Sequence, residues 1–186
     1  MDKKQETALL IAIEWQNNNL YFEESLKELK NLAKTAGLLV KDIVVQKREK
    51  PDPVYLIGKG KLEEIKTQLM ELDIDSLIFE DSLTPAQQSN LMNYLNIKVL
   101  DRTGLILDIF AQRANSKEGK LQVELAQLNY LLPRLKGKGT DFSRLGGGVG
   151  TRGPGETKLE SDRRHIRRKI QKVERELQQV KKHREV

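Results

Sequence analysis

The 186-residue chain contains no cysteine and only two histidines, His165 and His183. Disulfide bridges are therefore excluded, and the usual nitrogen and sulfur ligands of zinc are too few for a cluster, so no metal site is predicted. The longest apolar run, residues 8–13, has six residues, whereas a membrane helix needs roughly 20. No signal peptide is recognisable, and the sequence predicts a cytoplasmic protein with no membrane partner.

Positive charge is concentrated in the last third of the chain. Residues 116–186 contain 18 Lys and Arg against 9 Asp and Glu, a balance of +9. Residues 1–115 contain 15 and 18, a balance of −3. If the partner is a nucleic acid, its binding face is therefore expected in the last third.

Apolar stretches alternate with helical patterns over residues 1–115. The predicted strands are residues 7–14, 38–46, 76–79 and 97–100. A helical pattern ends at Gly37, two more cover residues 60–72 and 104–113, and Thr84-Pro85-Ala86-Gln87 opens another with a capping box. This alternation predicts an α/β domain, with a small, mostly parallel sheet of about four strands and flanking helices.

Residues 116–186 show heptad spacing, which predicts a long antiparallel α-helical hairpin. The first seam is Leu121, Leu125, Leu128, Leu132 and Leu135, and the second is Ile166, Ile170, Val173, Leu177 and Val180. Pro133 is expected to kink or end the first helix. A capping box at residues 157–160 places the start of the second helix near Lys158. The tip is a glycine-rich basic loop, at about residues 136–157.

The tip loop resembles a nucleotide-binding P-loop only in its spacing. Residues 150–157 fit G-x-x-x-x-G-K-T except that Glu156 stands in place of the lysine, and no strand precedes the loop. A carboxylate there would repel phosphate. No nucleotide site is therefore predicted in the loop, and no catalytic residue is assigned.

Two interpretations of the tip remain open. Eight of the 19 residues from Gly137 to Gly155 are glycine, which suits a flexible linker. Glycines that let backbone amides approach closely, together with arginines that fork onto phosphates, suit folded RNA instead. The candidate RNA-binding residues are Lys136, Lys138, Phe142, Arg144, Gly146, Gly147, Gly148, Gly150, Arg152, Gly153, Gly155, Lys158, Arg163, Arg164, Arg167 and Arg168. The last four could equally form a solvated helix face paired with Glu160 and Asp162.

A second candidate lies in the α/β part. Gly58, Lys59, Gly60 and Lys61 precede a helix and suit either a nest for a nucleotide or RNA phosphate, or a tight turn. Glu80, Asp81 and Asp101 end predicted strands, where catalytic groups often lie. Their short polar side chains also suit turns and helix caps, which is the preferred interpretation for Asp81 and Asp101.

Four segments carry a family resemblance: residues 55–64, 101–103, 122–128 and, above all, 144–164. Across essentially its whole length, the chain resembles the amino-terminal region of the HflX family of ribosome-associated GTPases. The resemblance implies an α/β subdomain and a helical hairpin that docks on the large ribosomal subunit. The hairpin loop would reach ribosomal RNA near the peptidyl transferase centre, and the protein would split or rescue stalled ribosomes.

The resemblance also implies a GTPase domain after this region, which would bind GTP and Mg²⁺. No G-x-x-x-x-G-K-[ST] motif occurs in residues 1–186, so the chain is expected to be part of a longer protein and has no predicted enzymatic activity of its own. We expect a monomer. ATP binding by the family's amino-terminal region would favour the nest at residues 58–61. The alternatives are a nucleotide-binding or ATP-hydrolysing α/β domain and a structural coiled-coil spacer.

Overall fold

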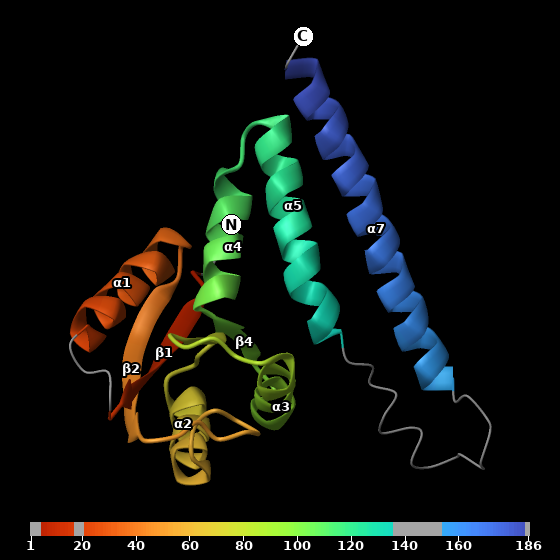
Figure 1. The fold of residues 1–186 in the computed structure, drawn as a ribbon. Helices are drawn as coiled ribbons and strands as arrows, with labels where there is room; N and C mark the ends of the chain where they lie inside the picture. The colour runs from red at the N-terminus through yellow and green to blue at the C-terminus, as the bar shows by residue number, and fades with distance from the viewer. Residues whose placement is uncertain (1–4, 17–20, 136–153, 185–186) are drawn as a thin grey trace. The chain divides into compact units, whose positions relative to one another are not determined.

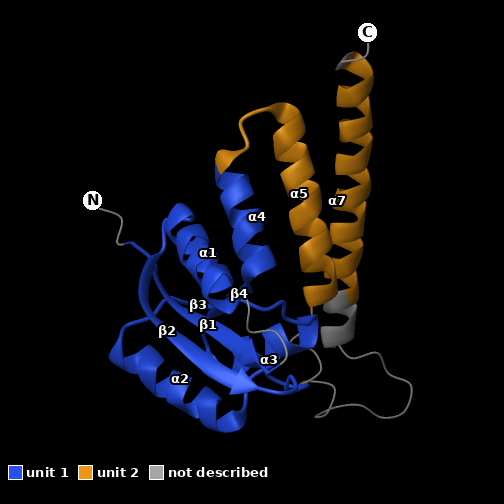
Figure 2. Cartoon of the chain, turned by 60° about the vertical axis from the view of Figure 1, so that its left-hand side comes forward, with its two compact units in different colours: residues 1–112 blue, residues 113–186 orange. Residues whose placement is uncertain are grey.

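The computed structural model describes residues 5–16, 21–135 and 154–184 (Figure 1). The chain divides into two compact units, residues 1–112 and residues 113–186, which Figure 2 colours blue and orange. Each unit buries apolar clusters of its own.

A four-stranded parallel sheet forms the centre of the first unit, with the strand order β2-β1-β3-β4. The strands are β1 (Thr7–Trp15), β2 (Leu39–Arg48), β3 (Ser76–Phe79) and β4 (Lys98–Asp101). The predicted α/β fold with a small parallel sheet is therefore confirmed.

Strand β1 is buried on both faces because its alternate side chains enter different apolar clusters. The helices of this unit are α1 (Phe22–Thr35), α2 (Lys59–Glu71), α3 (Pro85–Leu95) and α4 (Arg102–Arg113). Leu9, Ile11 and Ile13 pack with side chains of α2 and α3. Ala8 and Leu10 pack with side chains of α1 and α4. Two helices thus cover each face of the sheet.

Helix ends follow the signals in the sequence. Gly37, just after α1, has φ +86°, a left-handed conformation that favours glycine. Thr84 Oγ1 accepts the N–H of Gln87 at 3.1 Å, and Gln87 Oε1 accepts the N–H of Thr84 at 3.0 Å. This reciprocal pair is the predicted capping box of α3.

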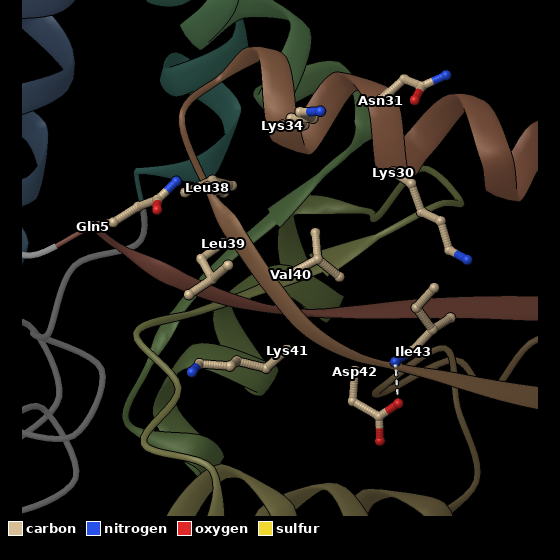
Figure 3. A pocket seen from close by; sticks show the side chains of 10 residues that line it. All are labelled: Gln5, Lys30, Asn31, Lys34, Leu38, Leu39, Val40, Lys41, Asp42 and Ile43. Carbon is tan, nitrogen blue, oxygen red and sulfur yellow. Dashed lines mark hydrogen bonds between the residues drawn. The ribbon is translucent and has the colours of Figure 1, made fainter.

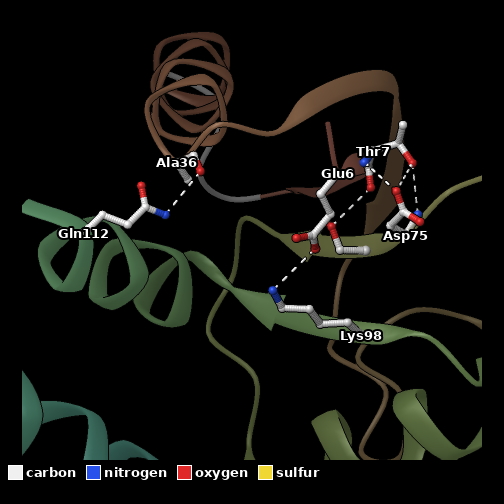
Figure 4. A network of polar contacts seen from close by, with 7 residues as sticks. Glu6, Thr7, Ala36, Asp75, Lys98 and Gln112 are labelled. Atoms are coloured by element: carbon white, nitrogen blue, oxygen red, sulfur yellow. Dashed lines mark hydrogen bonds and ion pairs between the residues drawn. The ribbon is translucent and has the colours of Figure 1, made fainter. Parts of the chain in front are cut away.

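Polar contacts connect the amino ends of the strands (Figure 4). Thr7 donates its N–H to Asp75 Oδ2 at 2.8 Å, and Asp75 donates its N–H to Thr7 Oγ1 at 3.0 Å. Lys98 Nζ lies 3.4 Å from Glu6 Oε1. These contacts join the starts of β1, β3 and β4, and so support their register.

The second unit contains α5 (Lys117–Leu131), the 3₁₀ turn η1 (Leu132–Arg134) and α7 (Pro154–Arg184). An apolar seam joins α5 and α7, which lie side by side in both views of the fold. Its buried members are Leu121, Leu128, Val173 and Leu177, and Leu125, Ile166, Ile170 and Val180 pack against them. All eight positions belong to the predicted heptad seams.

The predicted start of the second helix near Lys158 is wrong, because α7 begins at Pro154. Proline has its φ fixed near the helical value and lacks only an N–H that the first turn leaves unpaired, so it starts a helix readily. The capping box at residues 157–160, on which the predicted start was based, lies inside the helix. Pro133 lies in η1, where α5 ends, as expected.

Asp101 is buried at the end of β4 and accepts two backbone hydrogen bonds. Its Oδ2 accepts the N–H of Leu83 at 3.0 Å, and its Oδ1 accepts the N–H of Gly104 at 2.9 Å. One carboxylate thus caps α4 and fixes the segment before α3. The interpretation of Asp101 as a cap is confirmed.

We expect Asp101→Ala to lower the free energy of unfolding by about 2–4 kcal/mol, because it leaves two buried N–H groups without this acceptor. Asp101→Asn keeps one acceptor oxygen and should cost less. Urea denaturation followed by circular dichroism measures both. Equal stability of Asp101→Ala and the parent would contradict the capping role.

Candidate nucleic-acid interface

The third and fourth turns of α7 carry four arginines on adjacent rows of the helix surface. Arg164, Arg167 and Arg168 are exposed, and Arg163 is half-buried. Arg164 lies 3.7 Å from Glu160, an exposed pair that contributes little to stability. Within the described ranges, no ion pair involves Arg167 or Arg168, so these two guanidinium groups are available to an anionic partner.

Arg163 has a different role from its neighbours. It donates a hydrogen bond from a guanidinium nitrogen to the carbonyl oxygen of Leu135 at 3.1 Å. This bond joins α7 to Leu135, which is 28 positions earlier in the sequence. Leu135 directly precedes residues 136–153, which are called the tip segment below. Arg163 is three residues before Ile166, so it continues the heptad spacing of the second seam. At this position the hydrogen bond to Leu135 takes the place of apolar packing. Arg163 therefore holds the two flanks of the tip segment together.

A shallow pocket of about 530 Å³ follows the arginine rows along the side of α7. Its lining includes His165, Arg168 and Lys172, with Glu124 contributed by α5. Lys169 Nζ pairs with Glu124 across the helices at 2.9 Å. Glu176 also lines the pocket and lies 3.9 Å from Lys172, so both lining lysines are paired and the excess positive charge comes from Arg168.

Most of the predicted RNA-binding residues lie outside the described residues. These are Lys136, Lys138, Phe142, Arg144, Gly146, Gly147, Gly148, Gly150, Arg152 and Gly153. Gly155 and Lys158 lie in the first turns of α7. Their part in RNA binding stays a prediction, as does that of the four arginines.

The predicted nest at residues 58–61 is the amino-terminal end of α2. Gly58 is the residue before the helix, and its N–H is already taken by Gln46 Oε1 at 3.0 Å. Lys61 pairs with Glu64 in the same helix. Lys59 and Gly60 are exposed. Within the predicted nest, Gly58 and Lys61 therefore take part in local contacts, whereas Lys59 and Gly60 are exposed to solvent.

Sequence reasoning missed Arg48, which comes to this helix end from β2. A Cβ atom on Gly58 would lie 2.6 Å from a guanidinium nitrogen of Arg48, so the arginine lies directly against the glycine. A larger residue at position 58 would require the arginine side chain to shift. Residues 48 and 58 are separated by a loop with no periodic pattern, and no local signal in the sequence could have paired them.

The remaining strand-end carboxylates are engaged in structural contacts. Glu80 accepts hydrogen bonds from Ser25 and Arg102. Asp81 accepts the indole N–H of Trp15 at 2.8 Å. Burial raises the pKa of Asp81, and the bond from Trp15 opposes this rise. In the part of the chain that the structure describes, no cluster of three or more His, Asp or Glu side chains could hold a metal ion.

Comparison with known proteins identifies the two units. Residues 23–111 match the family model described as GTP-binding GTPase N-terminal, and residues 113–186 match GTP-binding GTPase Middle Region. The chain belongs to the HflX family of GTPases.

Relatives in the HflX family match almost the whole chain. "GTPase HflX" of Caldanaerobacter subterraneus is 54% identical over 98% of this chain and 42% of its own length. "GTPase HflX" of Escherichia coli is 46% identical over 87% of this chain and 38% of its own length. The chain thus spans about two fifths of these relatives.

A solved structure shares the fold. The crystal structure of SsGBP with GDP superimposes with a TM-score of 0.72 at 29% identity, covering 97% of this chain and 45% of that chain. A GTP-binding protein of Sulfolobus solfataricus with GDP gives a TM-score of 0.66 at 28% identity, covering 95% of this chain and 46% of that chain.

No helix among the described residues is long and apolar enough to cross a bilayer.

Arg163→Ala is expected to loosen the flank of the tip segment, because the carbonyl of Leu135 loses its donor. Amide hydrogen exchange at residues 132–135 should become about fivefold faster, which corresponds to roughly 1 kcal/mol. Arg167→Ala serves as the control, since Arg167 is exposed on the same helix. Mass spectrometry of peptides from this segment measures the rates, and identical exchange in both variants would contradict the role of Arg163.

Proposed function

We propose that this chain is the ribosome-binding, rRNA-contacting amino-terminal module of an HflX-like GTPase, which splits or rescues stalled ribosomes at the large subunit. The observation that supports it best is the group of exposed arginines in the third and fourth turns of α7, the helix that follows the glycine-rich segment. The RNA would be contacted near the peptidyl transferase centre. The module would act in the cytoplasm as a monomer.

The proposal assigns different tasks to the predicted domains. Residues 116–186 would form an antiparallel hairpin that presents residues 136–153, between its two helices, to RNA, and residues 1–115 would form the α/β body. The order of contacts supports the hairpin: Leu135, after the first helix, meets Arg163 near the start of the second, while Glu124 meets Lys169 farther along. One apolar seam then stiffens both arms.

Arginine suits this task because its planar guanidinium group forks onto phosphate oxygens and stacks on unpaired bases. Glycines at residues 146–155 would let the RNA backbone approach the peptide backbone closely. Because Arg167 and Arg168 lack ion pairs within the described ranges, they would meet phosphate without first losing a partner. GTP and Mg²⁺ would belong to a separate GTPase domain, and this module would contribute binding and no catalysis.

A second candidate function is nucleotide binding at the start of α2. Arg48, Lys59 and Lys61 lie around this helix end, and α2 has no acidic residue in its first turn. The helix dipole and the cations would favour a phosphate group there. We expect isothermal calorimetry with ATP to discriminate: heat that disappears in Lys59→Ala would support this candidate, and no heat with the parent protein would remove it.

The main proposal predicts a steep salt dependence for binding to purified large ribosomal subunits. Each phosphate contact releases counterions, at roughly 0.7–0.9 per contact in the slope of log affinity against log salt. Replacing Arg167 and Arg168 together by alanine should flatten this slope by between about one and two units. The fold should persist, because both side chains are exposed.

The matched control is Lys181→Ala with Lys182→Ala, which removes the same charge from exposed positions at the far end of α7. The control should bind with nearly the parent slope. Sedimentation at several salt concentrations gives the affinities. Coincident curves for all three proteins would show that the arginines make no RNA contacts and would favour the spacer interpretation.

A further inference from the structure

Strand β2 is an edge of the sheet and is unusually long for one. It covers Leu39–Arg48, ten residues, whereas the opposite edge strand β4 has four. Among the described residues, no strand pairs with its outer side. Leu39 and Val45 on this strand are 42% and 38% exposed. A long edge with exposed apolar side chains can accept another strand.

The outward hydrogen-bonding groups of β2 can be assigned from its contacts. The carbonyl of Arg48 accepts the N–H of Gln16, so Arg48 faces β1. Since alternate residues of a strand bond to opposite sides, Ile43, Val45 and Lys47 direct their backbone groups outward. The N–H of Ile43 is indeed bonded to the carboxylate of Asp42 at 2.8 Å (Figure 3). A carboxylate oxygen thus occupies the place of an incoming carbonyl.

A pocket of about 600 Å³ opens beside the start of this edge, between α1 and β2 (Figure 3). Leu39, Val40 and Ile43 contribute apolar side chains to its lining. Lys30 and Lys34 come from α1. These side chains would accommodate alternate residues of an added strand.

The charge of this edge is predominantly positive. Lys30, Lys34 and Lys41 are exposed lining residues, and Asp42 is the one acid among them. Within the described ranges, none of these lysines forms an ion pair. Lys41 is the extra residue of a β-bulge, because Ala8 pairs with Val40 while Leu9 pairs with Asp42. Lys41 therefore has no partner residue on β1, and β2 has one more residue, a lysine, than a regular pairing with β1 would require.

We propose that the outer edge of β2 binds an extended acidic peptide segment of a partner protein as an added strand. Main-chain hydrogen bonds to the backbone groups of Val45 and Lys47, and to the carbonyl of Ile43, whose N–H is taken by Asp42, would hold the segment. Its carboxylates would meet the lysines of α1 and β2. A second copy of this chain fits poorly, because the two edges would place lysine against lysine. RNA fits less well, because no aromatic side chain lines the pocket for base stacking.

The test uses the full 186-residue chain and a fluorescent ten-residue peptide of alternating valine and glutamate. A matched peptide with lysine for glutamate is the charge control. The acidic peptide should bind at least about tenfold more tightly, and the double change Lys30→Glu with Lys34→Glu should reverse this order. Fluorescence anisotropy measures both affinities. Both substitutions are on the surface, so the variant is expected to fold.

A proline at position 45 tests the main-chain contacts. Val45→Pro removes an outward N–H, which an edge strand tolerates, and should weaken binding of the acidic peptide about tenfold. Val45→Ala keeps the N–H and should weaken it much less. Hydrogen exchange of β2 amides should slow when the peptide is bound to the parent chain.

Three results would overturn the proposal. The first is equal affinity for the acidic and basic peptides. The second is binding that is unchanged in the charge-reversed variant. The third is binding of another occupant at this edge: either tighter binding of single-stranded RNA of the same charge, or a second copy of the chain, seen as concentration-dependent dimerisation that Val45→Pro abolishes. Each of these is independent of ribosome binding by the arginines of α7, so the two proposals can fail separately.

Discussion

Burial of β1 on both faces is the constraint on which the α/β unit depends. Residues 8–13 are almost wholly inaccessible, so this strand is stable only if helices cover both sides of the sheet. The order β2-β1-β3-β4 meets this need, because the chain places α1 and α4 on one face and α2 and α3 on the other. Placing β1 at the centre leaves β2 at an edge.

The second unit achieves rigidity by a different route. Its apolar contacts form a single narrow seam, which leaves most of the surface of α7 to charged and polar residues. A helix surface that does not have to cover a core can carry adjacent arginines at low cost in stability. This design accommodates the positive balance of residues 116–186, whereas residues 1–115 carry a small negative balance.

The features predicted from the sequence were those encoded locally. The apolar run of β1, the reciprocal capping box at Thr84 and the heptad seams each depend on residues within a few turns or one strand. The start of α7 at Pro154 was missed because two local signals competed there. The contact of Arg48 with Gly58 and the outward direction of the Ile43 N–H could not be predicted from the sequence. Both depend on how β2 lies beside α2 and β1 in the folded unit.

The candidate site follows the same division. Arg163, Arg164, Arg167 and Arg168 were found as a group from composition, but the sequence could not separate their roles. The contact between Arg163 and the Leu135 carbonyl makes one of them a structural residue, while Arg167 and Arg168 remain on the surface. The members of one basic run on a helix therefore differ in role: Arg163 joins the flanks of residues 136–153, and the exposed arginines would supply charge to the proposed RNA partner. If residues 136–153 bind RNA as proposed, the contact between their flanks would limit the separation of the segment's ends, and less conformational entropy would remain to be lost on binding.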